Sequence, residues 1–81
     1  MVRVLLFGKL RDVAGWRERV CEPAPATLSA LKALICQDDS DLADALAAPG
    51  VQAAVDRVLA RGDAGLPEGC EVAFMPAMSG G

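Results

Sequence analysis

The chain has 81 residues, which is enough for one domain and too few for two. Its net charge is -3 and its basic residues are scattered, so we expect no nucleic-acid partner. The apolar runs are short and interrupted by charged residues, which predicts no membrane span. The first residues form no secretory signal pattern, and we therefore expect a cytoplasmic protein.

The first two predicted strands are Val2–Phe7 and Trp16–Glu22. We expect their connection, Gly8–Gly15, to be a hairpin loop that pairs them in antiparallel orientation. The first strand alternates between two faces, with Val2, Val4 and Leu6 on one and Arg3, Leu5 and Phe7 on the other. Arg3 indicates that the second face is partly wet. Phe7 is therefore either exposed toward a partner or, if both faces are covered, part of the core.

A helix is predicted from Thr27, a suitable N-cap, to about Gln37. Its apolar side chains recur every three or four residues and form a stripe toward the sheet: Leu28, Leu31, Leu34 and Ile35. Ser40 is predicted to cap a second, shorter helix, which ends at Pro49-Gly50.

No metal site is predicted. The acidic residues around the second helix do not form a calcium loop, because Ala43 and Pro49 stand where Gly and Glu are required, and a solvated cap is expected instead. The three cysteines, Cys21, Cys36 and Cys70, lack zinc or redox spacing, so we expect them to act as small apolar residues. The chain contains no histidine, the most common general base and metal ligand.

Three further strands are predicted, at Val51–Val55, at Val58–Ala60 on an edge, and at Glu71–Met75. The opening hairpin argues against a doubly wound parallel sheet, which needs regular alternation of strands and helices. The element order predicts an α+β fold, in which a mixed sheet carries one main helix across it and a short second helix. This is the ubiquitin-like β-grasp, and we expect it over residues 1–76, with a flexible tail over residues 77–81.

The tail finishes with Gly80-Gly81, shortly after a strand and Pro76. Glycine has no Cβ, so such a tail can pass through a narrow channel in a partner enzyme, although it can also be a plain flexible end. A terminal carboxylate joined to AMP as a mixed anhydride can be attacked by a sulfur nucleophile, which yields a thiocarboxylate. A carrier of this kind needs no catalytic triad or phosphate-binding loop, and the sequence has neither motif.

The segment Gly69–Gly81 resembles the C-terminal signature of the small subunit of molybdopterin synthase. In that family Gly-Asp-Glu-Val-Ala is followed by apolar residues, Pro-Pro and a Gly-Gly end. The opening segment Val2–Gly8 with Arg11, and the segment Ala53–Val55, are similar to the first and third strands of the same family. The sequence departs from the family pattern where Asn, Asp and the second Pro are common, at Asp56, Cys70 and Ala77.

The resemblance implies a sulfur carrier in molybdenum cofactor biosynthesis, with no cofactor bound by the chain itself. An adenylating enzyme similar to ubiquitin-activating enzymes would use ATP to activate Gly81, and a sulfur-donor protein would convert it to the thiocarboxylate. Ala77, Met78, Ser79 and Gly80 would thread into the large subunit of molybdopterin synthase, which holds the catalytic residues. Sulfur would pass there to cyclic pyranopterin monophosphate and form the molybdopterin dithiolene, within a heterotetramer.

Four residues are predicted to form a partner interface beside the tail. Strand parity selects Phe7 and Met75, whereas Leu59 and, at the rim, Arg11 rest mainly on the resemblance. Apolar anchors with polar neighbours are typical of protein interfaces. The alternative is that some of these residues belong to the core.

Three other functions are open at this point. A sulfur carrier for thiamine thiazole or cysteine synthesis would share the chemistry at Gly81 and differ only in the acceptor. A ubiquitin-like protein modifier would form isopeptide bonds to lysines. A plain interaction domain would keep its function without Gly80 and Gly81.

Overall fold

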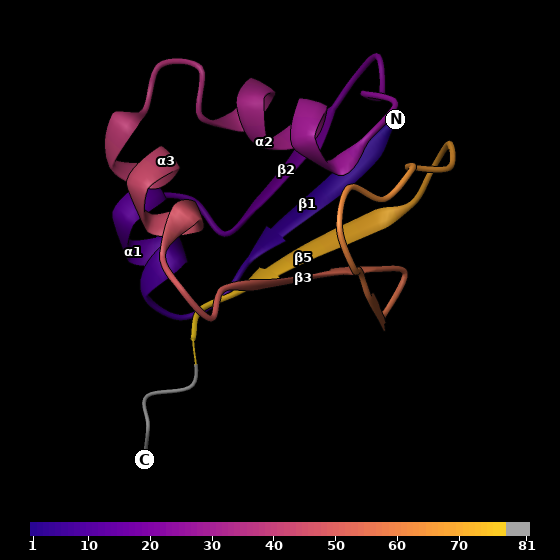
Figure 1. Cartoon of the computed structure of the whole chain (residues 1–81). Coiled ribbons are helices and arrows are strands. Elements are labelled where there is room, and N and C mark those ends of the chain that lie inside the picture. Colours follow the sequence, from indigo (N-terminus) through magenta and orange to yellow (C-terminus); the bar gives the residue numbers. More distant parts are fainter. Residues whose placement is uncertain (78–81) are drawn as a thin grey trace.

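The centre of the sheet is formed by the first and last strands of residues 1–77, the part of the chain that the structure describes (Figure 1). In this computed structural model, β1 (Val2–Leu6) pairs in parallel with β5 (Glu71–Met75). The flanking strands are antiparallel to their neighbours: β2 (Glu18–Cys21) beside β1, β3 (Gln52–Val55) beside β5, and β4 (Val58–Leu59) at the edge beside β3. The order β2-β1-β5-β3-β4 confirms the mixed sheet of the predicted ubiquitin-like β-grasp.

The segment between β1 and β2 is a helix and not the predicted hairpin loop. This helix, α1 (Lys9–Ala14), is enclosed by two glycines with positive φ, Gly8 at 57° and Gly15 at 82°. The N–H of Gly15 donates to the carbonyl of Arg11 (2.9 Å), and Leu10 is fully buried in the core. The two strands are nevertheless antiparallel, as predicted, because the helical connection reverses the chain.

The N-terminus of α2 (Leu28–Ile35) is capped as predicted. The hydroxyl oxygen of Thr27 accepts a hydrogen bond from the N–H of Ala30 at 3.3 Å. The rest of the predicted apolar stripe is buried, but the expectation for Leu34 is wrong, because this side chain is 43% exposed. Leu34 lies about 100° around the helix from Ile35, at the border of the stripe, so it faces away from the sheet.

The third helix, α3 (Ser40–Ala47), has eight residues, as does α2, so the predicted contrast between a main helix and a shorter one is wrong. Its N-cap is Asp39 and not Ser40, since the carboxylate of Asp39 accepts a hydrogen bond from the N–H of Leu42 (3.0 Å). A carboxylate also suits the positive end of the helix dipole. Leu42 and Leu46 are the buried residues through which α3 packs on the core.

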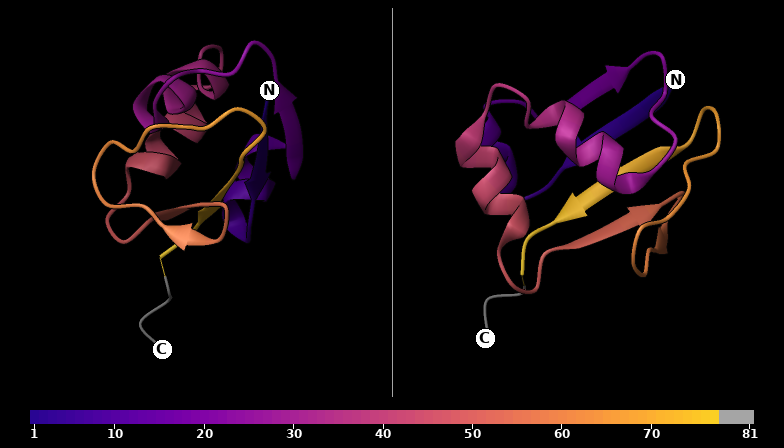
Figure 2. Two further views of the ribbon diagram at one scale, coloured as in Figure 1. Left: turned by 90° about the vertical axis from the view of Figure 1, so that its right-hand side faces the viewer. Right: turned by 45° about the horizontal axis from the view of Figure 1, so that its top comes forward.

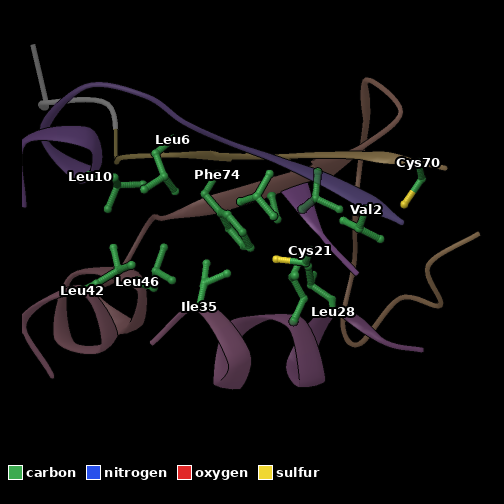
Figure 3. Close-up of a cluster of buried hydrophobic side chains, with 14 residues drawn as sticks. Val2, Leu6, Leu10, Cys21, Leu28, Ile35, Leu42, Leu46, Cys70 and Phe74 are labelled. Atoms are coloured by element: carbon green, nitrogen blue, oxygen red, sulfur yellow. The ribbon is translucent and has the colours of Figure 1, made fainter. Parts of the chain in front are cut away.

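The core lies between the sheet and the helices (Figure 3). Phe74 of β5 is the largest fully buried side chain of residues 1–77. The strands and helices around it contribute the other members of the cluster: Val2, Val4, Leu6, Leu10, Cys21, Leu28, Leu31, Ile35, Leu42, Leu46, Ala53, Cys70 and Val72. Cys21 and Cys70 therefore act as small apolar residues, as predicted, and burial raises the pKa of both thiols.

The loop between β4 and β5 is tied to the start of α2. Asp63 in this loop accepts two hydrogen bonds from Ser29, one from the backbone N–H and one from the hydroxyl, both 2.8 Å long. The N–H of Leu28 also donates to the carbonyl of Ala64 (2.8 Å). The bonds from Ser29 lower the pKa of the Asp63 carboxyl, because they favour its charged form.

We expect the Asp63→Asn variant to be less stable than the wild type at pH 7 and to approach wild-type stability in acid. The folded-state pKa of Asp63 lies below the unfolded-state value of about 3.9. Its contribution is therefore present above that pH and is lost as the pH falls through the folded-state pKa. Solvent screens this exposed group, so the expected effect is modest. Urea unfolding at neutral and strongly acidic pH measures it, and a difference that stays constant with pH would contradict the assignment.

Candidate functional site

The two sides of the sheet differ in character. The helices α2 and α3 lie on one side (Figure 2), and we call the opposite side the open face. Side-chain alternation buries one set of residues from the central strands toward the helices: Val2, Val4, Leu6, Val72 and Phe74. The other set points to the open face: Arg3, Leu5, Phe7, Ala73 and Met75. The predicted parity of both strands is thus confirmed.

Strand register aligns four apolar residues in one row across the open face. Leu5 of β1 lies opposite Ala73 of β5. Ala73 in turn lies opposite Ala54 of β3, and Ala54 lies opposite Leu59 of β4. The two alanines are short, and Ala54 is only 7% exposed, so small apolar side chains separate Leu5 from Leu59 in this row.

Phe7 and Met75 lie beside this row, at the end of the sheet where β5 finishes. Leu6 pairs with Phe74, and the N–H of Phe7 donates to the carbonyl of Phe74 (3.1 Å), so Phe7 and Met75 are the next residues of neighbouring strands. Phe7 is 47% exposed and Leu59 is 55% exposed. Met75 is half-buried. Phe7 is therefore not a core residue. Its contact with a partner stays a prediction.

We call this surface the open-face patch, and its six members are Leu5, Phe7, Ala54, Leu59, Ala73 and Met75. An exposed aromatic and an exposed leucine around small residues form an apolar surface of the kind that anchors a protein partner. Single exposed apolar side chains are common on protein surfaces. Several neighbouring ones on an uncovered sheet face are less common and are typical of interaction sites.

The other end of the open face carries charged side chains beside the exposed Val20, which lies opposite Arg3. Arg3 lies between two carboxylates there, with its Nε 3.4 Å from Glu18 and its Nη1 3.9 Å from Glu71. All three side chains are partly exposed, so these ion pairs add little stability. Their position shows instead that these charged side chains of the open face lie away from the end of β5.

Arg11 lies on α1 and not on the sheet, and its side chain is exposed. It lines a shallow hollow together with Trp16 and Arg17. The structure therefore brings three of the four predicted interface residues together on the open face and leaves Arg11 on the neighbouring helix.

The tail begins at the same end of the sheet. β5 is held between β1 and β3 up to Met75, and Pro76 and Ala77 follow as the last described residues. The predicted tail residues Met78, Ser79, Gly80 and Gly81 lie outside the described part of the chain.

Residues 1–77 offer little chemistry of their own. They contain no group of three or more side chains arranged to hold a metal ion. Burial raises the pKa of the Cys36 thiol, with a further contribution from Asp39, so this thiol stays protonated at neutral pH. Within the same residues, no helix is long and apolar enough to cross a membrane.

Sequence reasoning missed part of the open-face patch. Ala54 was predicted as a strand residue without a role, and its place between Ala73 and Leu59 depends on the register of β3 with both neighbours. Strand alternation places Leu5 and Ala73 on the same face as Phe7 and Met75, but neither is among the predicted interface residues. The sequence signal that could have indicated this patch is a pair of large apolar residues on neighbouring strands with small apolar residues between them.

The fold and the open face define the chain as a small ubiquitin-like β-grasp protein. The model of the ThiS family matches residues 4–81. The chain therefore belongs to the ThiS family, whose ubiquitin-like β-grasp members act as sulfur carriers or protein modifiers.

Several solved chains match this structure, including two crystal structures from Haloferax volcanii. The crystal structure of SAMP1 from Haloferax volcanii aligns with a TM-score of 0.81 and 22% sequence identity, covering 99% of this chain and 98% of that chain. A second crystal structure, of H. volcanii small archaeal modifier protein 1, aligns with a TM-score of 0.71 and 20% identity, covering 95% and 97% of the two chains. No curated protein matches the sequence.

Proposed function

We propose that this chain is a sulfur carrier whose reactive group is the terminal carboxylate of Gly81. The observation that carries the proposal is the end of β5, where a strand fixed in the centre of the sheet leads into the tail beside the open-face patch. A carrier needs a rigid body, a surface that partners recognise and a slim arm. The family match includes residues 78–81, so the tail lies within the length that the family shares.

The proposed chemistry takes place on partner enzymes. An adenylating enzyme joins the Gly81 carboxylate to AMP from ATP and releases pyrophosphate. A sulfide-level sulfur nucleophile supplied by a donor protein then attacks the acyl carbon and displaces AMP, which forms the C–S bond of the thiocarboxylate. Where the donor presents this sulfur as a persulfide, the product is an acyl disulfide, and a thiol reductant cleaves its S–S bond to leave the thiocarboxylate and a disulfide. No described side chain of the carrier is needed for either step.

We further propose that the acceptor is cyclic pyranopterin monophosphate, bound to the large subunit of molybdopterin synthase in the cytoplasm. The support is the resemblance of the segment Gly69–Gly81 to the small subunit of that enzyme. In this complex Ala77, Met78, Ser79 and Gly80 thread toward the large subunit, and the open-face patch contacts its surface. Arg11 supplies a charged contact from α1. Two large and two small subunits would form the heterotetramer.

A second candidate function is protein modification. The structure with a TM-score of 0.81 is that of SAMP1, and its companion is described as a small archaeal modifier protein. Their identity to this chain is at most 22%, so they share the fold and do not decide the reaction. A modifier would use the same adenylated Gly81 and transfer it to a lysine amine.

We expect intact mass spectrometry to detect replacement of one oxygen by sulfur after incubation with the cognate adenylating enzyme, ATP and a sulfide source. The Gly81 deletion should lose this change completely, because the reacting carboxylate is displaced from its place in the enzyme. An unchanged wild-type mass with a competent enzyme would remove the carrier proposal.

Two further measurements separate the alternatives. Co-purification with a large synthase subunit, followed by dithiolene formation from the pterin, supports the molybdopterin assignment over thiamine thiazole or cysteine synthesis. Lysine-linked conjugates on a denaturing gel, without pterin conversion, would support the modifier.

A further inference from the structure

Two glycines outside the open-face patch lie against Pro76 and Ala77, the residues at the base of the tail. A Cβ placed on Gly8 would come within 2.9 Å of Cγ of Pro76, and a Cβ placed on Gly50 would come within 2.8 Å of Cβ of Ala77. Both distances are shorter than contacts that real Cβ atoms make, so either methyl group would push the chain aside. The remaining positive-φ glycines of residues 1–77 have nothing within 4 Å of such a Cβ: Gly15, Gly62 and Gly69.

Each of these two glycines is held in place by its own loop. Gly8 lies between β1 and α1, and its carbonyl accepts a hydrogen bond from the N–H of Arg11 (3.1 Å). Gly50 lies between α3 and β3 in a Pro49-Gly50 turn, which the N–H of Val51 closes by donating to the carbonyl of Ala48 (3.3 Å).

The turn at Gly50 has the features of a type II turn. Its φ of 84° at the third position and the proline at the second position are typical of that type. In Figure 1 the chain leaves β5 at the end of the sheet where the loop after β1 and the loop before β3 also lie. The base of the tail is therefore contacted from two loops that are far apart in the sequence.

We propose that Gly8 and Gly50, the glycine pair, are positioning residues that fix the point and direction at which the tail leaves the domain. The importance of that direction for activity rests on the proposed carrier function. The reacting carboxylate must reach the partner's active site while the domain is bound to that partner through its open-face patch. Preorganising the base of the tail lowers the cost of that alignment, and a 1 Å misplacement can cost about 10²-fold in rate.

The competing explanation is that both positions need glycine only for their backbone conformation. The chain offers a matched control, because Gly15 has φ 82° and Gly50 has φ 84°, yet only Gly50 contacts the tail. An alanine at either position carries the same penalty for positive φ. Only the alanine at position 50 also displaces Ala77.

The structural test uses the full chain alone. In the wild type we expect a nuclear Overhauser effect between the α protons of Gly50 and the methyl protons of Ala77, because these groups are in contact. In Gly50→Ala we expect this signal to be lost and the chemical shift of the Ala77 amide to change. In Gly15→Ala we expect the Ala77 amide shift to stay as in the wild type. Absence of the wild-type signal would overturn the proposal whatever the function of the chain.

The functional test is the rate of Gly81 adenylation by the cognate enzyme. We expect Gly50→Ala to lower kcat/KM about tenfold or more, as displacement of a reacting group does, and Gly15→Ala to leave it within about twofold. The double variant Gly50→Ala/Ala77→Gly lacks the methyl–methyl overlap and should recover the rate of Ala77→Gly alone. Equal losses in Gly50→Ala and Gly15→Ala, or no recovery in the double variant, would refute the positioning role.

A further variant covers the case in which Gly50→Ala does not fold. Ala77→Val keeps the Pro49-Gly50 turn intact and adds bulk where Ala77 meets Gly50, so it should lower kcat/KM without loss of stability. A wild-type rate in a folded Ala77→Val protein would count against the proposal. If the wild type itself is not adenylated, the carrier function fails, while the contact between Gly50 and Ala77 is still decided by the proton measurement.

Discussion

The Phe74→Ala variant is expected to lose about 3–5 kcal/mol of unfolding free energy, the usual cost of truncating a buried phenylalanine. Phe74 has no exposed surface and is the largest fully buried side chain of the described residues. A domain of this length has a total stability of roughly 4–12 kcal/mol, so this loss removes about a quarter or more of the total and unfolds the domain if its stability lies at the low end of that range. Urea or guanidinium unfolding followed by circular dichroism measures it.

The chain contains a matched control, because Phe7 is its only other phenylalanine. Phe7 directly follows β1 beside β5, but points to the open face and is 47% exposed. We expect Phe7→Ala to change the unfolding free energy by about 1 kcal/mol or less, since part of the ring is already in water. Equal losses for the two variants would show that Phe7 is a core residue and that the assignment of faces is wrong.

The strands were the most predictable part of this fold. β5 (Glu71–Met75) begins and ends where its alternating pattern predicts, because Pro76 cannot donate to the sheet and Gly69 bends the chain before it. Each of the other strands is shorter at one or both ends than its apolar pattern. The ends of a strand are set by where its hydrogen bonds to the neighbouring strand stop. The strand's own sequence does not indicate that position.

The helices show where local patterns fail. α1 has six residues and a single buried anchor, Leu10, so no apolar period distinguishes it from a loop. Asp39 and Ser40 are both good N-cap residues, and the choice between them depends on where α3 packs. Tertiary contacts therefore set the details that propensity leaves open.

The candidate site divides in the same way. Phe7 and Met75 could be placed on one face from alternation alone, because the period of a strand is two residues. The addition of Ala54 required the register of three strands, and the contacts of Gly8 and Gly50 with the tail required the approach of two separate loops. A glycine that is needed for a turn looks the same in the sequence as one that is also needed for a close contact.

The Phe7→Asp variant is expected to weaken binding of the adenylating enzyme or the large synthase subunit about 30-fold or more while the domain stays folded. Truncated aromatic anchors at interfaces commonly cost at least about 2 kcal/mol. The variant also places a carboxylate where a partner would remove it from water. Isothermal titration calorimetry or surface plasmon resonance gives the affinity, and circular dichroism reports the fold.

Val58→Asp provides the matched control for this experiment. Val58 is 70% exposed, and its pairing with Val55 opposite Val72 assigns it to the helix side of the sheet rather than the open face. The control introduces the same charge change on an exposed apolar residue, so non-specific electrostatic effects should appear equally in both variants. A partner affinity lowered only by Phe7→Asp assigns docking to the open-face patch. Equal affinities for the two variants and the wild type would place the partner on another surface, because a carboxylate cannot be buried at an interface without cost.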